Sequence, residues 1–500
     1  MEFNPSSPVK CASSKNAYDD ELLKNLFWQI LNFGSKGGFL IILTPMMILK
    51  WGKEGFGLFA LASSLLVSMA LLDGGVRTLT RIQIASALKR GDEEGWHRVY
   101  AEGLLTFSSV CLIVTLISFA VARSGWMTRV LNLPPGGSEV LVLTIVCTSV
   151  FMTTTLGLEP IAASGNLSSV KEANTYGALA AIPICAALVL CGASISMVII
   201  AYSLSLTVPN LVVAWQKELF ALKPWKFIRH FGPRIAWNTL RSGSWFYLVT
   251  IAMVLKSHAL TFVISAMAGP VEAGMFYVLL RLSEMVSNVA ATSCETTTAA
   301  LTLAVDTRER QQRFRQSWLH VALFSAIGVL MFILLLDDLL SFWLKGQYSA
   351  SPLLGLSLGC FGLSGALCGV VTCAAAGLNL ARSGAIAGFS EELLGAVGAT
   401  AGFYFAGLPG LFFGGSLGVF CLLPLSNTIA EKCGWSSAAE WIFMLRPLMP
   451  GIFLAGIIME ASSWSRSPMV WLLSLVLCAG IAFWQLREMQ SSEKTDTGCL

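Results

Sequence analysis

Charged and amide side chains recur at helical spacing inside apolar stretches of this 500-residue chain. Asn32 and Lys36 are four residues apart, and Lys36 has no acidic residue within one helical turn in sequence. A second stripe contains Arg281, Glu284, Asn288 and Glu295. Residues three, four or seven apart share one face of an α-helix, so each set predicts a polar stripe on a helix. Ammonium and guanidinium groups on such stripes could hold an anion.

Two further places put charge at or inside an apolar stretch. Lys256 and His258 occupy one of them, whereas Asp73, Arg77 and Arg81 follow the uncharged run 56–72. A charge within hydrocarbon is costly unless it meets water, an anion or a charged partner. Asp73, Arg77 and Arg81 therefore fit either an interfacial ion pair with anchors at the inner surface or the mouth of a cavity.

Alternatives also stay open for the charges that lie deeper in apolar stretches. Arg281 and Glu284 fit a buried pair that locks a helix, or a pair that meets cargo. Lys36 favours the lining of a hydrated cavity, because a lone ammonium there would otherwise cost several kcal/mol, on the order of a buried unpaired polar group. Lys256 leaves cavity lining and a structural role equally open.

The composition indicates a membrane protein. Only 12% of the residues are charged, 55% are hydrophobic and 45 are glycine, whereas about a quarter of a soluble domain is charged. The chain has room for many spans of about 20 apolar residues, and no long polar stretch could fold as a separate soluble domain. The net charge of +4 gives no indication of nucleic-acid binding.

Apolar runs of membrane length predict an all-α polytopic protein with about 14 transmembrane helices. The first six runs are 24–49, 56–76, 101–122, 139–158, 174–191 and 194–214. The next six are 238–266, 272–303, 318–336, 352–376, 383–405 and 409–429, followed by 439–460 and 467–486. The expected division is a disordered cytoplasmic tail at 1–21, an N-lobe at 22–216, a basic linker with a C-lobe at 217–430, two additional helices within 431–487 and a cytoplasmic tail at 488–500.

The distribution of basic residues predicts the orientation. With the N-terminus inside, 24 of the 33 basic residues fall on the inner side, six fall outside and three lie within spans. Because Lys and Arg are retained on the cytoplasmic side, both termini are expected to be cytoplasmic. The stretches KEGFGLFALASSLL and VEAGMFYVLLRLSE, which open the second and eighth spans, share Glu, Gly and Phe at nearly constant offset, a weak sign of two duplicated halves.

Motifs of enzyme chemistry are not visible in the sequence. No metal-ligand cluster, nucleophile triad or phosphate-binding loop occurs, and the 13 cysteines are scattered singly, mostly within apolar runs. The adjacent acids Asp337 with Asp338 and Glu391 with Glu392 point in different helical directions and are expected near span ends. The sequence therefore predicts a protein that is not an enzyme and has no cofactor or metal.

A family resemblance rests on three stretches that follow the polar first span. GKEGFGLFALASSLLVSMALLDGGVRTLTRIQIA, the inner loop KRGDEEGWHRV and the later AGPVEAGMFYVLLRLSEMV resemble the polysaccharide transporter family. These are Wzx-type flippases of lipid-linked oligosaccharides in the MOP superfamily, whose relatives include the MATE antiporters and the lipid II flippase. The likeness covers about residues 22–430.

The resemblance implies two six-helix lobes around a central cavity that opens alternately to each side and is lined by the first, second, seventh and eighth spans. Carried over by position, the cavity candidates are Asn32, Lys36, Arg77, Lys256 and Arg281. The eighth-span stripe adds Glu284, Asn288 and Glu295. Family members often have an acid in the seventh span, where this chain has Lys256 and His258, so a coupling acid would have to be Glu284, Glu295 or another residue.

The expected function is transport of a polyprenyl-diphosphate-linked oligosaccharide to the outer leaflet of a bacterial inner membrane, for export of O-antigen, exopolysaccharide or capsule. Coupling to an H⁺ or Na⁺ gradient is open, and the expected partners are the lipid-linked oligosaccharide, membrane lipids, a polysaccharide polymerase and chain-length machinery. One alternative is a MATE-like cation or drug antiporter, although the first span has no acid between Lys24 and Lys50. Another is a membrane polysaccharide polymerase or ligase, although every expected outer loop is short.

Overall fold

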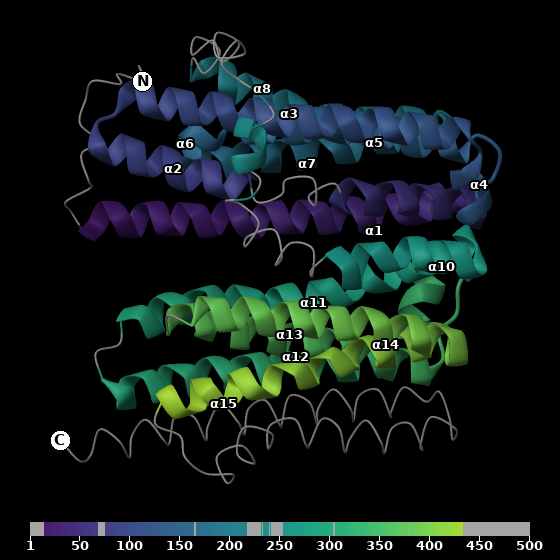
Figure 1. The fold of residues 1–500 in the computed structure, drawn as a ribbon. Helices are drawn as coiled ribbons and strands as arrows, with labels where there is room; N and C mark the ends of the chain where they lie inside the picture. The colour runs from purple at the N-terminus through teal and green to yellow at the C-terminus, as the bar shows by residue number, and fades with distance from the viewer. Residues whose placement is uncertain are drawn as a thin grey trace. The chain divides into compact units, whose positions relative to one another are not determined.

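The computed structural model of the chain is built almost entirely of helices (Figure 1). It describes residues 15–68, 76–164, 167–217, 232, 234–239, 241, 254–303, 306–378 and 380–433. Lys36, Asn288 and Glu295 belong to described helices, but their side chains lie outside the described part. No strand occurs within these ranges. The predicted all-α, multi-pass membrane class is confirmed.

The chain divides into two compact units, one formed by residues 1–254 with Thr261–Met275 and the other by Leu255–Leu260 with residues 276–500. The helices of the first unit are α1 (Lys15–Ser68), α2 (Val76–Arg90), α3 (Glu93–Arg123), α4 (Trp126–Val130), α5 (Gly137–Gly157), α6 (Glu159–Ala163), α7 (Leu167–Leu190), α8 (Ile195–Gln216) and α10 (Leu260–Ala268). Successive pairwise contacts link these helices: α2 packs on α3, α3 on α5, α5 on α8, α8 on α7 and α7 on α1. Contact between α1 and α5 brings the two ends of this series together.

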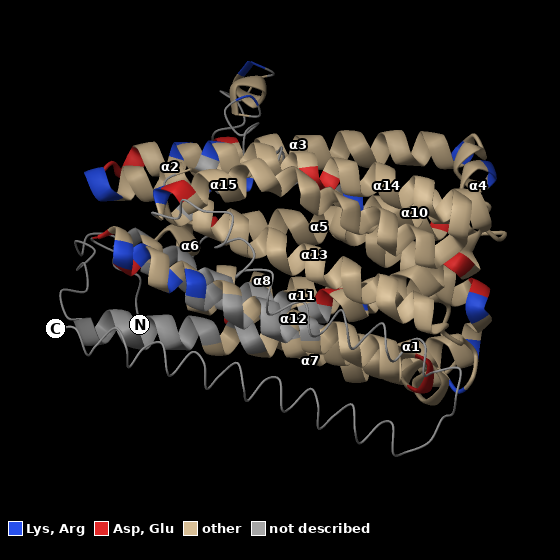
Figure 2. Ribbon diagram, turned by 90° about the horizontal axis from the view of Figure 1, so that it is seen from below, with Lys and Arg blue, Asp and Glu red and all other residues tan. Residues whose placement is uncertain are grey.

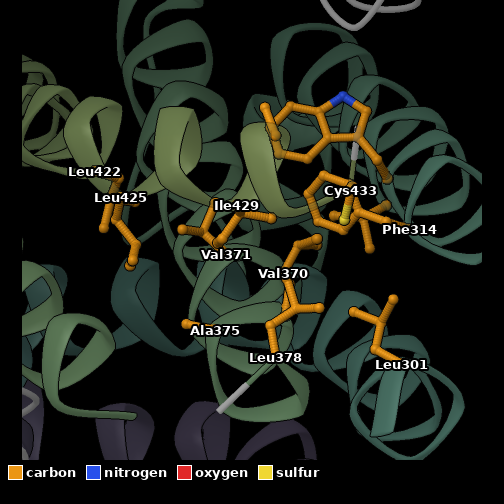
Figure 3. Packing of buried hydrophobic residues seen from close by; sticks show 14 of the residues in the cluster. Leu301, Phe314, Val370, Val371, Ala375, Leu378, Leu422, Leu425, Ile429 and Cys433 are labelled. Carbon is orange, nitrogen blue, oxygen red and sulfur yellow. The ribbon is translucent and has the colours of Figure 1, made fainter. Parts of the chain in front are cut away.

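The second unit is built around long helices that lie side by side. Its elements are the π-helix η4 (Leu255–Ala259), most of α11 (Pro270–Leu303), α12 (Thr307–Trp343), α13 (Pro352–Gly377), α14 (Ala381–Ser416), the 3₁₀ helix η5 (Leu417–Leu422) and α15 (Leu423–Lys432). Helix α13 packs between α12 and α14, and it also contacts η5 and α15. A buried cluster that includes Phe314, Val370 and Ile429 joins α12, α13 and α15 (Figure 3).

Six helical segments within the described ranges are long and apolar enough to cross a membrane. They are Glu93–Arg123, Gly137–Ala163, Ser168–Leu190, Ile195–Gln216, Pro352–Ala375 and Arg382–Lys432. They coincide with predicted spans that begin at residues 101, 139, 174, 194, 352 and 383. Figure 2 shows Lys, Arg, Asp and Glu gathered toward the ends of the described helices, with only a few along their middles. This distribution is typical of helices that cross hydrocarbon.

Two pairs of predicted spans run into one another and are separated by a break in the helix. Spans 24–49 and 56–76 meet within α1 at Gly52, whose φ of 71° lies in the left-handed region that favours glycine. Spans 383–405 and 409–429 meet within α14 at Ala406 and Gly407, where φ changes from −139° to 62° just before Pro409. The proline removes a backbone donor, so the chain reverses there without an unpaired N–H.

The N-terminal boundary differs from the prediction. Helix α1 begins at Lys15, within the segment expected to be a disordered tail, because KNAYDDELLKN has neither Pro nor Gly and is mostly composed of good helix formers. Residues 1–14, most of the basic linker and the two additional helices expected after residue 433 lie outside the described residues.

The two similar stretches noticed in the sequence contact each other through glycine. A Cβ on Gly57 would overlap the backbone carbonyl of Pro270, and a Cβ on Gly274 would lie 3.1 Å from the Cα of Gly57. Small residues at helix crossings in membranes let backbones approach closely. The start of α11 therefore packs directly against the second half of α1, both within the first unit.

Candidate functional site

A buried group of charged side chains occupies the second unit. Lys256 and His258 lie on η4, and only 4% and 5% of their surfaces are exposed. A single π-helical turn is rare and is often found at functional sites, because it widens the helix and changes the direction of its side chains. In this chain the turn carries the side chains of Lys256 and His258 into the interior of the unit.

Two adjacent glutamates meet the Lys256 ammonium. Lys256 Nζ donates to Glu391 Oε1, and it lies 3.8 Å from Glu392 Oε2. The Glu391 side chain is fully buried, whereas 19% of the Glu392 side chain is exposed. Ser364 on α13 donates to Glu391 Oε1 at 3.4 Å, and Lys256 Nζ lies 5.3 Å from the centre of the Phe361 ring. The Lys256 ammonium thus lies against two carboxyl groups.

A second ion pair continues the polar group along α11. Arg281 Nη1 donates to Glu284 Oε2 at 2.5 Å, one helical turn away, and the guanidinium lies 5.0 Å from the centre of the Tyr277 ring. His258 Nε2 lies 4.0 Å from Glu284 Oε1. The Arg281 side chain is 22% exposed, so it reaches the surface of the unit, unlike the nearly enclosed Lys256.

Several polar atoms of this group have no hydrogen-bond partner among the described residues. They are His258 Nδ1, Arg281 Nε and Glu391 Oε2. Buried polar atoms are nearly always paired, so three orphans in one group indicate water, a proton or a ligand that completes it.

A seam of glycines positions the glutamates. The two halves of α14 fold back on each other after Gly407, and a Cβ on Gly398, Gly402 or Gly414 would overlap the backbone of the opposite half. A Cβ on Gly395 would lie 3.0 Å from the Lys256 side chain. Because Gly395 has no side chain, the Lys256 side chain can lie beside it, one turn from Glu391.

The first unit contains a separate arginine clamp. Arg77 and Arg81, one turn apart on α2, both donate to the carboxylate of Glu159 at the start of α6. Glu159 is 1% exposed, and the two arginine side chains are 35% and 37% exposed. The clamp joins α2 to α6.

Comparison with solved structures identifies the architecture. The lipid II flippase MurJ in an inward closed conformation has a TM-score of 0.67 at 11% identity, over 94% of this chain and 99% of that one. An inward-facing multidrug resistance MATE family transporter of the MOP superfamily has a TM-score of 0.65 at 15% identity, over 82% of this chain and 96% of that one. The chain has a MATE-like fold. No protein-family model matches the sequence, and a search of curated proteins finds no match either.

The MATE family structures match 82% of this chain. A eukaryotic MATE transporter, AtDTX14, is matched at 12% identity with a TM-score of 0.53, over 82% of this chain and 98% of that one. Sequence identity this low establishes the fold only. The polysaccharide specificity expected from the sequence resemblance therefore stays a prediction.

The structure places the predicted site residues in different surroundings within the MATE-like fold. Asn32 is half-buried on α1, and Arg77 belongs to the arginine clamp. Lys256 is buried and paired with Glu391, and Arg281 is paired with Glu284. For Lys36, Asn288 and Glu295 the described part of the chain gives only a helical backbone.

Sequence reasoning missed the acidic partners. Glu391 and Glu392 were expected near a span end and in different directions, but Glu391 lies about three turns into α14 and both carboxyl groups reach Lys256. Glu159 was not a candidate at all, yet it holds both arginines of the second span. An acid in an apolar stretch was the available signal in each case, because such residues are rare in membranes unless they are paired.

Proposed function

We propose that the protein is a flippase that moves a polyprenyl-diphosphate-linked oligosaccharide from the inner to the outer leaflet of a bacterial inner membrane by alternating access, with both termini in the cytoplasm. The observation that carries the proposal is the MATE-like fold, matched over 94% of the chain by a lipid II flippase. The resemblance of GKEGFGLFALASSLLVSMALLDGGVRTLTRIQIA to polysaccharide transporters supports the oligosaccharide cargo.

The physical task of such a flippase is to carry a diphosphate and many hydroxyl groups through hydrocarbon. Moving an isolated ion into a medium of low dielectric constant costs on the order of tens of kcal/mol. A hydrated passage lined by cations and amides lowers that cost, because it replaces the water around the phosphates. Lys36 and Asn32 on α1 supply such groups at helical spacing.

Arg281 is a better candidate than Lys256 for direct contact with the diphosphate. Both cations are paired with carboxylates, but 22% of the Arg281 side chain is exposed against 5% for Lys256. Arg281 has five N–H donors in a planar fork that suits phosphate, and Glu284 occupies only part of it. We therefore assign cargo contact to Arg281 and Lys36, and assign Lys256 to the interior of the second unit.

Flipping in vesicles tests the proposal. Purified protein is reconstituted with a fluorescent polyprenyl-diphosphate oligosaccharide, and an impermeant reductant quenches only the outer leaflet. Wild-type protein should make the whole label accessible, whereas protein-free vesicles should retain about half. Lys36→Ala with Arg281→Ala should slow the exchange, and Arg123→Ala, which removes an exposed cation at the end of α3, should not. Unchanged exchange in the double variant at normal expression would rule out the cationic contact.

A cation or drug antiporter is the second candidate, because a MATE family transporter matches with a TM-score of 0.65 and the second unit holds three buried or half-buried carboxyl groups. Efflux of a fluorescent organic cation from the same vesicles separates the two functions. A flippase should exchange the lipid-linked saccharide and leave the cation gradient intact. The reverse result would replace our proposal by the antiporter.

A further inference from the structure

The charges of the buried group in the second unit do not balance. Arg281 with Glu284 is a neutral pair, and His258 beside it can remain neutral. Lys256, in contrast, faces both Glu391 and Glu392. Two ionised carboxylates around one ammonium would leave a net negative charge in the interior, which costs several kcal/mol even after relaxation of the surroundings.

We infer that Glu392 is a proton-binding site, and that its carboxyl group carries an exchangeable proton while Glu391 stays ionised against Lys256. This site is separate from the cargo contacts assigned above. Its use in energising transport would rest on the proposed function, whereas binding of the proton does not depend on the cargo.

Geometry decides which carboxyl group takes the proton. Glu391 accepts directly from the ammonium and from Ser364, and both donors stabilise its ionised form. Glu392 lies 3.8 Å from the ammonium, outside hydrogen-bond distance. Its side chain is also 19% exposed, so a proton can reach it, whereas Glu391 is enclosed.

The unpaired oxygen of Glu391 fits this assignment. Glu391 Oε2 is buried and has no donor among the described residues, and both carboxyl groups lie against the same ammonium. A protonated Glu392 can donate to that oxygen, whereas two carboxylates could only repel each other. The proton therefore neutralises the excess charge and also satisfies the orphan acceptor.

The other groups around the site favour a proton over a metal ion. The facing titratable groups are Lys256 from η4, Cys368 from α13 and Glu391 from α14 itself. The ammonium already occupies the position between the carboxyl groups and would repel a metal ion. No cluster of three or more metal-ligating side chains occurs among the described residues. The neutral thiol of Cys368 and the hydroxyl of Ser364 complete the surroundings.

Infrared difference spectroscopy of the full-length protein tests the site without any cargo. Spectra recorded at two pH values, both above the range in which exposed carboxyl groups titrate, should differ in the carbonyl-stretch band of a protonated carboxyl group, which shifts in D₂O, unlike lipid ester bands. Glu392→Gln should remove this band. Glu309→Gln, which changes an exposed partner of Arg313, should leave it unchanged. Lys256→Met should increase the band, because two carboxyl groups then lack their counter-ion.

Two outcomes would overturn the inference. One is the absence of any titrating carboxyl band in the wild-type protein above the range in which exposed carboxyl groups titrate, a result that needs no variant to fold. The other is a band that survives in Glu392→Gln, provided that the variant elutes as the wild type in size-exclusion chromatography. If it does not, Glu392→Asp must shift the band, and an unshifted band counts against the site.

The vesicle assay separates this inference from the proposed function. A titrating Glu392 band without exchange of the lipid-linked saccharide at any pH would refute the flippase and keep the proton site. Exchange without the band would refute the proton site and keep the flippase. When both hold, Glu392→Gln should lose the acceleration that an imposed pH gradient gives to the wild type.

Discussion

At the scale of single residues, the arginine clamp shows how a buried acid organises the edge of a membrane helix. Glu159 receives hydrogen bonds from two guanidinium groups on α2, with Arg81 Nη2 at 3.1 Å from Oε1. Both arginines are about one-third exposed, so water stabilises them in part. Glu159 itself is enclosed, and its carboxylate is paired with both arginines.

We expect Glu159→Gln to destabilise the protein by about 2 kcal/mol, because charge-assisted hydrogen bonds are lost and the amide cannot satisfy both guanidinium groups. The check is the midpoint of thermal unfolding in detergent, followed by size-exclusion chromatography. Glu102→Gln serves as the control, since its partner Arg98 is 66% exposed and such a pair contributes little. Equal midpoints for the two variants would contradict a structural role for the clamp.

The Lys256 pair leads to a different prediction, because both partners are nearly enclosed. Lys256→Met should cost about 3 kcal/mol, since it leaves the buried Glu391 carboxylate without a cation. Glu391→Gln added to Lys256→Met should recover part of that loss, because the second change removes the unpaired charge. A double-mutant cycle of unfolding midpoints measures the recovery. Additive losses would show that the two groups do not interact.

At the scale of elements, close backbone approach places the site. The two halves of α14 cross at Gly398 and Gly414, and a Cβ on either glycine would overlap the main chain of the other half. This crossing sets the distance between the two halves of α14, and the Lys256 side chain lies beside Gly395 near it. Small residues at this seam therefore matter for the site as well as for packing.

Gly414→Ala should destabilise the protein by about 2 kcal/mol, the usual cost of overpacking a close contact. It should also weaken the carbonyl-stretch band assigned to Glu392. Gly34→Ala is the matched control, because Gly34 lies within α1 and an added Cβ there meets no atom within 4 Å. That control should be neutral or stabilising by about 0.5 kcal/mol, as Ala favours a helix. An unchanged unfolding midpoint for Gly414→Ala would show that the two halves of α14 can move apart enough to admit a Cβ.

The helices themselves could be predicted from the sequence, whereas the ion pairs between them could not. Runs of apolar residues located the six described spans, because membrane thickness fixes their length. The pairs Arg77–Glu159 and Lys256–Glu391 join residues 82 and 135 positions apart, and periodicity carries no information about such distances. The π-turn at Lys256 was also invisible, because it arises from packing within a unit, whereas the break at Gly407 falls between the predicted spans 383–405 and 409–429.

At the scale of the whole molecule, the distribution of charge predicts how the MATE-like fold is inserted. Twenty-four of the 33 basic residues lie on one side of the predicted spans and six on the other. Each excess Lys or Arg opposes translocation of its loop, so the total strongly favours cytoplasmic termini. The same orientation puts the loop between α7 and α8 outside.

Cys191 provides a native probe of that orientation. It is exposed in the short connection between α7 and α8, whereas Cys11 and Cys499 belong to the tails that are expected inside. An impermeant maleimide added to intact spheroplasts should label Cys191, and Cys191→Ser should abolish most of that signal. Permeabilisation should then add the label on the tail cysteines, because their thiols become accessible only from the cytoplasm. Labelling of the Cys191→Ser protein in intact spheroplasts, at the wild-type level, would reverse the predicted topology and with it the direction in which the proposed flippase delivers its cargo.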